Sequence, residues 1–210
     1  MVHKLKIIPL FILFLFALIA LSPISAQEKQ EVVLTISAAK SGEKMDAFNR
    51  AEELRKDQKF AEAMAEYQKV IQLGETCGKE AEAHYDIGIC LIWLGRRDEA
   101  DALFKDVLQL YPDNKEVAAY TRYCQSWIDV QRGKYEPAIA RLHETLNQKT
   151  WTDEAFCSRA LFQIGRIYLS FMQDQANAEQ VFRLVLEKYP NAEITNHPFL
   201  DGLKKEMALD

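Results

Sequence analysis

Two arginines in the last third of the chain have a spacing that could serve molecular recognition. Arg159 and Arg166 are seven residues apart, which places them two turns apart on one side of a helix. Each guanidinium could hold a carboxylate of a partner through a pair of hydrogen bonds. The alternative is that both arginines are solvated or pair with local acids. The spacing therefore allows binding of acidic groups and indicates no covalent chemistry.

The other chemically active residues form neither a catalytic nor a metal-binding pattern. Four cysteines occur at Cys77, Cys90, Cys124 and Cys157, with no C-x-x-C pair and no histidine at ligand spacing, so no zinc site is expected. Cys90 and Cys124 fall within apolar helical stripes, which favours buried thiols. The even count leaves disulfides open, because an exported protein can form them. Motifs of nucleophiles, phosphate loops and metalloproteases are absent, so we expect no enzyme and no cofactor.

The N-terminus has the composition of an export signal. A basic start is followed by the uninterrupted apolar run Ile7–Leu21, then by Pro23 and small residues up to Ala26. This order predicts a secretory signal peptide over residues 1–26, with export to the periplasm or secretion. The alternative is an uncleaved membrane anchor, because residues 7–26 carry no charge and are long enough to span a bilayer.

Charge excludes one class of partner. The formal net charge is −5 and the basic residues are not clustered, so the chain lacks the footprint of a nucleic-acid-binding protein. Membrane contact is expected only through an uncleaved N-terminus. Residues 27–43 are polar apart from Val32, Val33 and Leu34, and they are predicted to form a flexible leader.

From Met45 onward the apolar pattern has the period of a helix and repeats along the chain. An alanine followed four residues later by an aromatic residue or leucine marks one helix of each repeat, at Ala63, Ala100, Ala138 and Ala178. The preceding helix of each repeat carries a small residue for close contact, at Ala51, Gly88, Ser126 and Gly165. Helices are predicted over residues 45–57, 60–73, 79–94, 97–110, 115–132, 135–148, 152–172 and 176–188, with a short final helix over about 198–208.

The spacing of Gly88, Gly95, Ala100, Phe104 and Pro112 resembles a tetratricopeptide repeat. This resemblance implies an all-α, right-handed superhelical solenoid of about four helix pairs with a C-terminal capping helix. The expected repeats cover 44–77, 81–114, 119–152 and 158–192 within residues 44–192, and the cap covers residues 193–210. The marker alanines lie 37, 38 and 40 residues apart, longer than the family period of about 34.

Arrays of this family expose the first helix of each pair on a concave surface, which implies a binding groove. Tyr85, Ile89 and Trp93 form one stripe, on a helix that is apolar nearly all round. The complete set of predicted groove residues is Phe48, Tyr85, Ile89, Trp93, Tyr120, Tyr123, Trp127, Arg159, Phe162 and Arg166. The alternative is that Trp93 and Trp127 only pack against neighbouring first helices.

The sequence therefore favours a non-catalytic scaffold of the cell envelope that binds a protein or peptide segment in an aromatic-lined groove. A structural module is the second hypothesis, in which the groove is filled by another copy of the chain. An enzyme of unrecognised type ranks third.

Overall fold

The computed structural model describes residues 26–74, 78–147 and 153–207. The predicted signal peptide, except for Ala26, and Cys77 lie outside these residues. Within them the chain forms nine α-helices and two short 3-10 helices, and no strand. The all-α prediction is confirmed.

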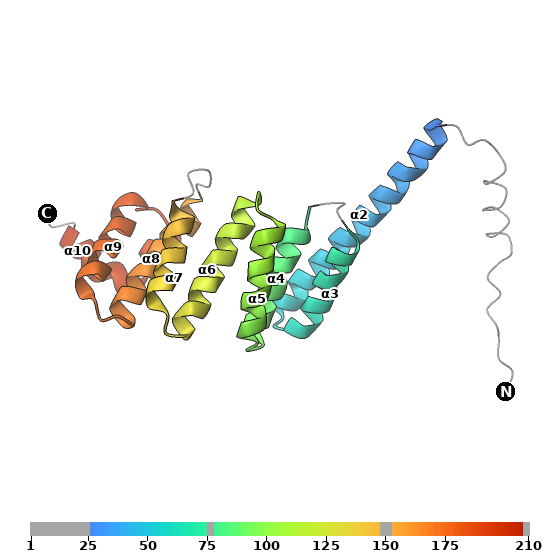
Figure 1. Cartoon of the computed structure of the whole chain (residues 1–210). Coiled ribbons are helices and arrows are strands. Elements are labelled where there is room, and N and C mark those ends of the chain that lie inside the picture. Colours follow the sequence, from blue (N-terminus) through green and yellow to red (C-terminus); the bar gives the residue numbers. More distant parts are fainter. Residues whose placement is uncertain (1–25, 75–77, 148–152, 208–210) are drawn as a thin grey trace.

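The helices form pairs that follow one another in chain order along a single row (Figure 1). The first helices of the pairs are α2 (Ala26–Lys56), α4 (Glu80–Trp93), α6 (Lys115–Gln131) and α8 (Glu154–Ser170). The second helices are α3 (Phe60–Gln72), α5 (Arg97–Leu110), α7 (Tyr135–Leu146) and α9 (Gln175–Lys188). Seven of these eight helices begin and end within two residues of the predicted bounds, and α2 is the exception.

In two of the pairs a glycine on the first helix faces a phenylalanine on the second. Gly88 of α4 lies against the ring of Phe104 of α5, and Gly165 of α8 lies against Phe182 of α9 in the same way. The marker alanines of the second helices are at most 1% exposed. The close approach of the two backbones therefore depends on the absence of a side chain at one position, as the sequence predicts.

The Phe104 ring leaves no room for a side chain at position 88. A Cβ atom there would lie closer than 3.0 Å to three carbon atoms of the Phe104 ring. We expect Gly88→Ala to lower the free energy of unfolding by about 1–3 kcal/mol, the usual cost of overpacking. Gly42→Ala is the matched control, because a Cβ atom at this helical position meets nothing within 4 Å. It should raise stability by up to about 1 kcal/mol. Urea denaturation of both variants tests the opposite signs.

The turn inside each pair uses one left-handed residue at an equivalent position. These residues are Gln58, Gly95, Gly133 and Gln173, with φ angles of 61°, 77°, 72° and 56°. Glycine adopts this conformation without strain, whereas a residue with a Cβ atom does so at some cost. The first pair therefore has the turn geometry of the middle pairs without its glycine. In the last pair the turn is one residue longer, and Asp174 N–H donates to the carbonyl of Tyr168.

The leader is a correction to the sequence analysis. Residues 27–43, predicted to be flexible, are the first half of α2, and Figure 1 shows this half extending beyond the row of pairs. Val33 and Leu34 in this half are each 63% exposed. The segment contains no proline and many good helix formers, so the packed half of α2 can propagate into it. No helix in the described ranges is long and apolar enough to cross a membrane.

The C-terminal segment caps the array with short helices. Two 3-10 helices, η1 (Glu193–Asn196) and η2 (Pro198–Leu200), precede the short helix α10 (Asp201–Met207). The cap predicted over 193–210 is therefore not a single helix, because its first half consists of two 3-10 helices. Leu200 is fully buried, while Phe199 packs edge-to-face on Phe182 at 5.1 Å between ring centroids. The segment thus covers the last pair with a few side chains.

Candidate functional site

A hollow of about 440 Å³ lies between the first helices α4 and α6. Four of its lining residues belong to the predicted groove, namely Ile89, Trp93, Tyr123 and Trp127. The remaining lining residues are Ile92, Gly95, Arg97 and Cys124. The helical spacing within α4 and α6 therefore brings the predicted aromatic stripes of two successive repeats around one cavity.

The two tryptophans stand at this hollow in different ways. Trp93 is 69% exposed, and its ring stacks on Phe60 of α3, with 5.8 Å between the ring centroids and 6° between the ring planes. Trp127 is partly buried, and the Arg97 guanidinium lies over its ring at 5.7 Å. Trp93 is therefore not a core residue, although Phe60 holds its ring in place. Trp127 forms a wall of the hollow with one cation on it.

Behind the hollow the tyrosines link three first helices. The rings of Tyr85 on α4 and Tyr120 on α6 lie 6.1 Å apart between centroids. Tyr120 and Tyr123 both pack edge-to-face with Phe156 of α8, at 4.9 and 5.8 Å between centroids. Burial raises the pKa of Tyr85, whose hydroxyl lies 3.7 Å from Cys124 Sγ. These tyrosines therefore support the packing between repeats and offer only part of their surface to a partner.

Two predicted groove residues are in the core, and the prediction that they line a surface is wrong. Phe48 is 9% exposed and packs edge-to-face on Tyr67 at 5.7 Å. Phe162 is 5% exposed and lies 5.4 Å from Phe182 and 4.9 Å from the His197 ring. In each case a residue from outside the first helix covers the ring. The aromatic residues of the stripe are thus exposed or partly exposed on α4 and α6, whereas those on α2 and α8 belong to the core.

The predicted arginines differ from the others in their pairing. The chain has ten arginines, and seven of them form an ion pair with an acid in the described ranges. The three without such a pair are Arg97, Arg159 and Arg166, all exposed. Arg97 lines the hollow. Arg159 and Arg166 lie two turns apart on one side of α8, and both oppose the rise that burial causes in the pKa of Tyr123.

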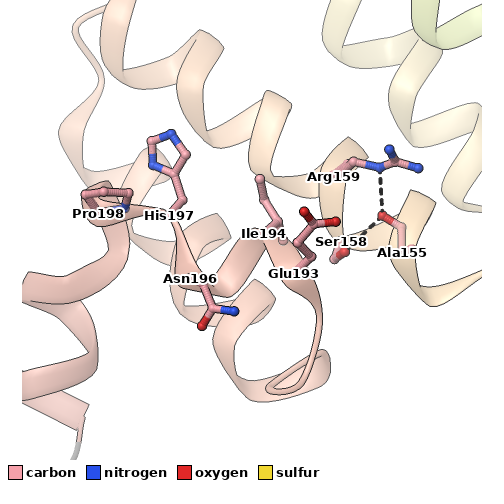
Figure 2. A pocket seen from close by; sticks show the side chains of 8 residues that line it. All are labelled: Ala155, Ser158, Arg159, Glu193, Ile194, Asn196, His197 and Pro198. Atoms are coloured by element: carbon pink, nitrogen blue, oxygen red, sulfur yellow. Dashed lines mark hydrogen bonds between the residues drawn. The ribbon is translucent and has the colours of Figure 1, made fainter.

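A second cleft, of about 640 Å³, lies between α8 and the C-terminal segment. Figure 2 shows Arg159 at one end, His197 and Pro198 at the other, and Glu193 and Ile194 between them. The Nε of Arg159 donates to the Ala155 carbonyl at 3.1 Å, which holds the side chain along α8. Arg159 therefore belongs to both the predicted groove and this cleft.

Several residues that line the hollow and the cleft are not among the predicted groove residues. Arg97 is not among the predicted groove residues, yet it follows Trp93 by four residues across the turn and lines the hollow. Glu193, Asn196 and His197 lie outside the repeats, and their approach to α8 had no sequence signal. Cys90, Cys124 and Cys157 are free and buried, and no cluster of potential metal ligands occurs among the residues that the structure describes.

Comparison with known proteins identifies the repeats. Models of the tetratricopeptide repeat match residues 54–123 and residues 159–192. No curated protein matches the chain. Two similar solved structures are pilF of Pseudomonas aeruginosa and the MamA RS-1 ArsTM double mutant.

Both solved structures share the fold at low sequence identity. The pilF structure is 18% identical with a TM-score of 0.61, over 81% of this chain and 72% of that chain. The MamA structure is 18% identical with a TM-score of 0.55, over 79% of this chain and 85% of that chain. Repeats of this kind bind protein or peptide partners and are generally non-catalytic. The chain is an all-α solenoid that carries tetratricopeptide repeats.

Proposed function

We propose that this chain is a non-catalytic scaffold of the cell envelope that binds a segment of a partner protein in the hollow between α4 and α6. The observation that supports the proposal is the meeting of Trp93, Trp127, Tyr123 and Ile89 around one open cavity. Aromatic rings supply a large contact area at low entropic cost, and tryptophan is enriched among the residues that dominate binding energy.

The chemistry of the hollow selects an apolar side chain. Its walls are aromatic and aliphatic, with Arg97 as the only charged lining residue. Burying one large apolar side chain there would contribute about 1.5–3 kcal/mol. Trp93 needs little reorganisation, because the Phe60 ring already holds it. An anchor of this kind, together with surrounding contacts, suits an extended or helical partner segment.

The cellular location is part of the proposal. The basic start, the apolar run Ile7–Leu21 and the small residues before Gln27 support export, with the repeats in the periplasm or outside the cell. Sequencing the N-terminus of the protein isolated from cells tests cleavage. A start at Gln27 is expected, whereas an intact Met1 would support an anchor formed by residues 7–26.

The double variant Trp93→Ala with Trp127→Ala tests the site. It should keep the helical circular-dichroism signal nearly unchanged and lose at least about tenfold in affinity for the captured partner, since each tryptophan is a candidate anchor. The partner is identified by crosslinking in the native envelope fraction, and its affinity is then measured with purified proteins. Leu110→Ala is the matched control, because Leu110 is a 60% exposed apolar residue on a second helix.

Two results would contradict this assignment. A loss of helicity in the double variant would show that the tryptophans serve the core. A dimer that resists dilution and dissociates only in the double variant would show that the hollow is filled by a second copy. Sedimentation of the unmodified chain over a wide concentration range distinguishes this structural role from partner binding.

A further inference from the structure

Arg159 is the point at which the aromatic face meets the C-terminal cleft. On one side it lies one helical turn beyond Phe156 of α8, on which Tyr120 and Tyr123 pack at 4.9 and 5.8 Å between ring centroids, and its charge opposes the rise that burial causes in the pKa of both tyrosines. On the other side it lines the cleft with Glu193, Asn196 and His197. A partner segment that leaves the tryptophan hollow along Tyr123 therefore reaches Arg159 and then the cleft.

The charges along this path favour an acidic segment. Arg97, Arg159 and Arg166 are exposed and pair with no acid in the described ranges, whereas the other arginines do pair. Three uncompensated guanidinium groups on one face stand out in a chain of net charge −5. Beside half-buried aromatic rings the effective dielectric constant is lower than in water, so an ion pair made there is stronger.

The cleft offers hydrogen-bonding groups of both kinds. Phe199 N–H donates to His197 Nδ1 at 3.2 Å, so a neutral ring carries its proton on Nε2 and can donate it. Asn196 can donate and accept. Glu193 forms no ion pair with Arg159, although both line the cleft, and its carboxylate can accept a backbone N–H. This set complements a peptide backbone, with a cation at one end for an acidic side chain.

We infer that the partner segment anchored in the tryptophan hollow continues into the C-terminal cleft and places the carboxylate of an Asp or Glu side chain on Arg159. The inference rests on the proposed function, because it concerns the same partner. The C-terminal segment is then part of the binding surface as well as a cap. It supplies the contacts that follow the acidic residue.

Helix packing sets the spacing between the two anchors. The hollow lies between α4 and α6, and Arg159 lies near the start of α8. With neighbouring axes about 8–10 Å apart, and with a rise of 1.5 Å per helical residue, the separation is about 15–20 Å. An extended chain covers this distance in about five or six residues. The recognised segment should therefore carry a large apolar residue and, five or six positions away, an acidic one.

A displayed library of random twelve-residue peptides, selected on the purified chain, tests this spacing. Enriched peptides should share a large apolar residue and an Asp or Glu five or six positions away. For one enriched peptide, Arg159→Gln should weaken binding roughly tenfold, the effect of losing a charge-assisted hydrogen bond. The same peptide with its acid changed to the amide should bind Arg159→Gln and the unmodified chain equally. Arg183→Gln is the matched control, since Arg183 pairs with Glu179 on α9.

The cleft itself is tested by Asn196→Ala and by truncation. Removing the peptide residues beyond the acid should weaken binding to the unmodified chain and have less effect on Asn196→Ala. The inference would be overturned if the selected peptides lack an acid, or if Arg159→Gln does not change the affinity for peptides that have one. Either result would leave the proposed role of the tryptophan hollow unaffected. If Trp93→Ala with Trp127→Ala does not affect selection, both proposals fail. If amidating the peptide terminus removes the acid effect, the carboxylate is terminal and the assigned side chain is wrong.

Discussion

Phe104→Ala is expected to lower the free energy of unfolding by about 3–5 kcal/mol, the largest single effect that the structure predicts. Phe104 is fully buried, and its ring fills the space that Gly88 leaves on α4. It also lies 6.2 Å from Tyr85, between ring centroids. Because α4 and α5 lie in the middle of the row, the cavity should also weaken the coupling between the two ends of the array.

Urea denaturation followed by far-ultraviolet circular dichroism measures this effect. Phe171→Ala is the control of equal size, because Phe171 is 41% exposed and contacts Tyr135 at 5.4 Å. Apart from the lost stacking on Tyr135, Phe171→Ala should lower the free energy of unfolding by less than about 1 kcal/mol. A broadened transition in Phe104→Ala would accompany uncoupling of the repeats. Equal losses of unfolding free energy in the two variants would contradict the role of Phe104 in packing α5 against α4.

Asp86→Asn is expected to stabilise the protein at pH 8, by up to about 4 kcal/mol, and to have little effect near pH 4. Burial raises the pKa of Asp86 to about 7, and this effect outweighs the attraction of Arg55. Arg55 Nε lies 3.9 Å from the Asp86 carboxylate, while its terminal nitrogen donates to Glu52 at 2.7 Å. Arg55 is therefore shared between Glu52 and Asp86, and Asp86 is buried near a second carboxylate, that of Glu52.

The sign of the pH dependence follows from proton binding. Between pH 4 and pH 7 the folded chain keeps the Asp86 proton and the unfolded chain has lost it, so stability contributed by this group falls as the pH rises. The amide variant removes that loss. Asp106→Asn, a change of the same chemistry at an exposed position of α5, is the matched control. Destabilisation of Asp86→Asn at pH 8 would show that the ion pair with Arg55 outweighs burial.

Much of the fold could be predicted because its determinants are local. The contacts between Gly88 and Phe104 and between Gly165 and Phe182 are written in the spacing of small and large residues. The sequence Tyr111–Pro112 ends α5, since proline biases the preceding residue away from helix. The error at α2 has the same origin. Residues 27–43 lack an apolar stripe, which favours the prediction of flexibility, but helix propensity and a packed neighbour suffice for a helix.

The site could be predicted only in part, because exposure depends on what covers a residue. Trp93 and Phe162 occupy similar stripes on their helices. Trp93 remains 69% exposed beside α6, whereas Phe162 is covered by His197, thirty-five residues further along the chain. No pattern within one helix pair predicts a contact with a residue so far along the chain. Arg97 likewise reaches the hollow only because the turn at Gly95 places it beside Trp127.

The sequence by itself determined the repeat, the helix bounds and the side of each helix that carries aromatic residues, because these depend on spacings within one helix pair. Only the tertiary structure decided which of those residues form a cavity and which fill the core. That outcome depends on how successive pairs stack and on where the chain returns after the last repeat. For this protein the stacking opens a hollow at Trp93 and Trp127, and the returning segment closes Phe162 and adds a cleft at Arg159.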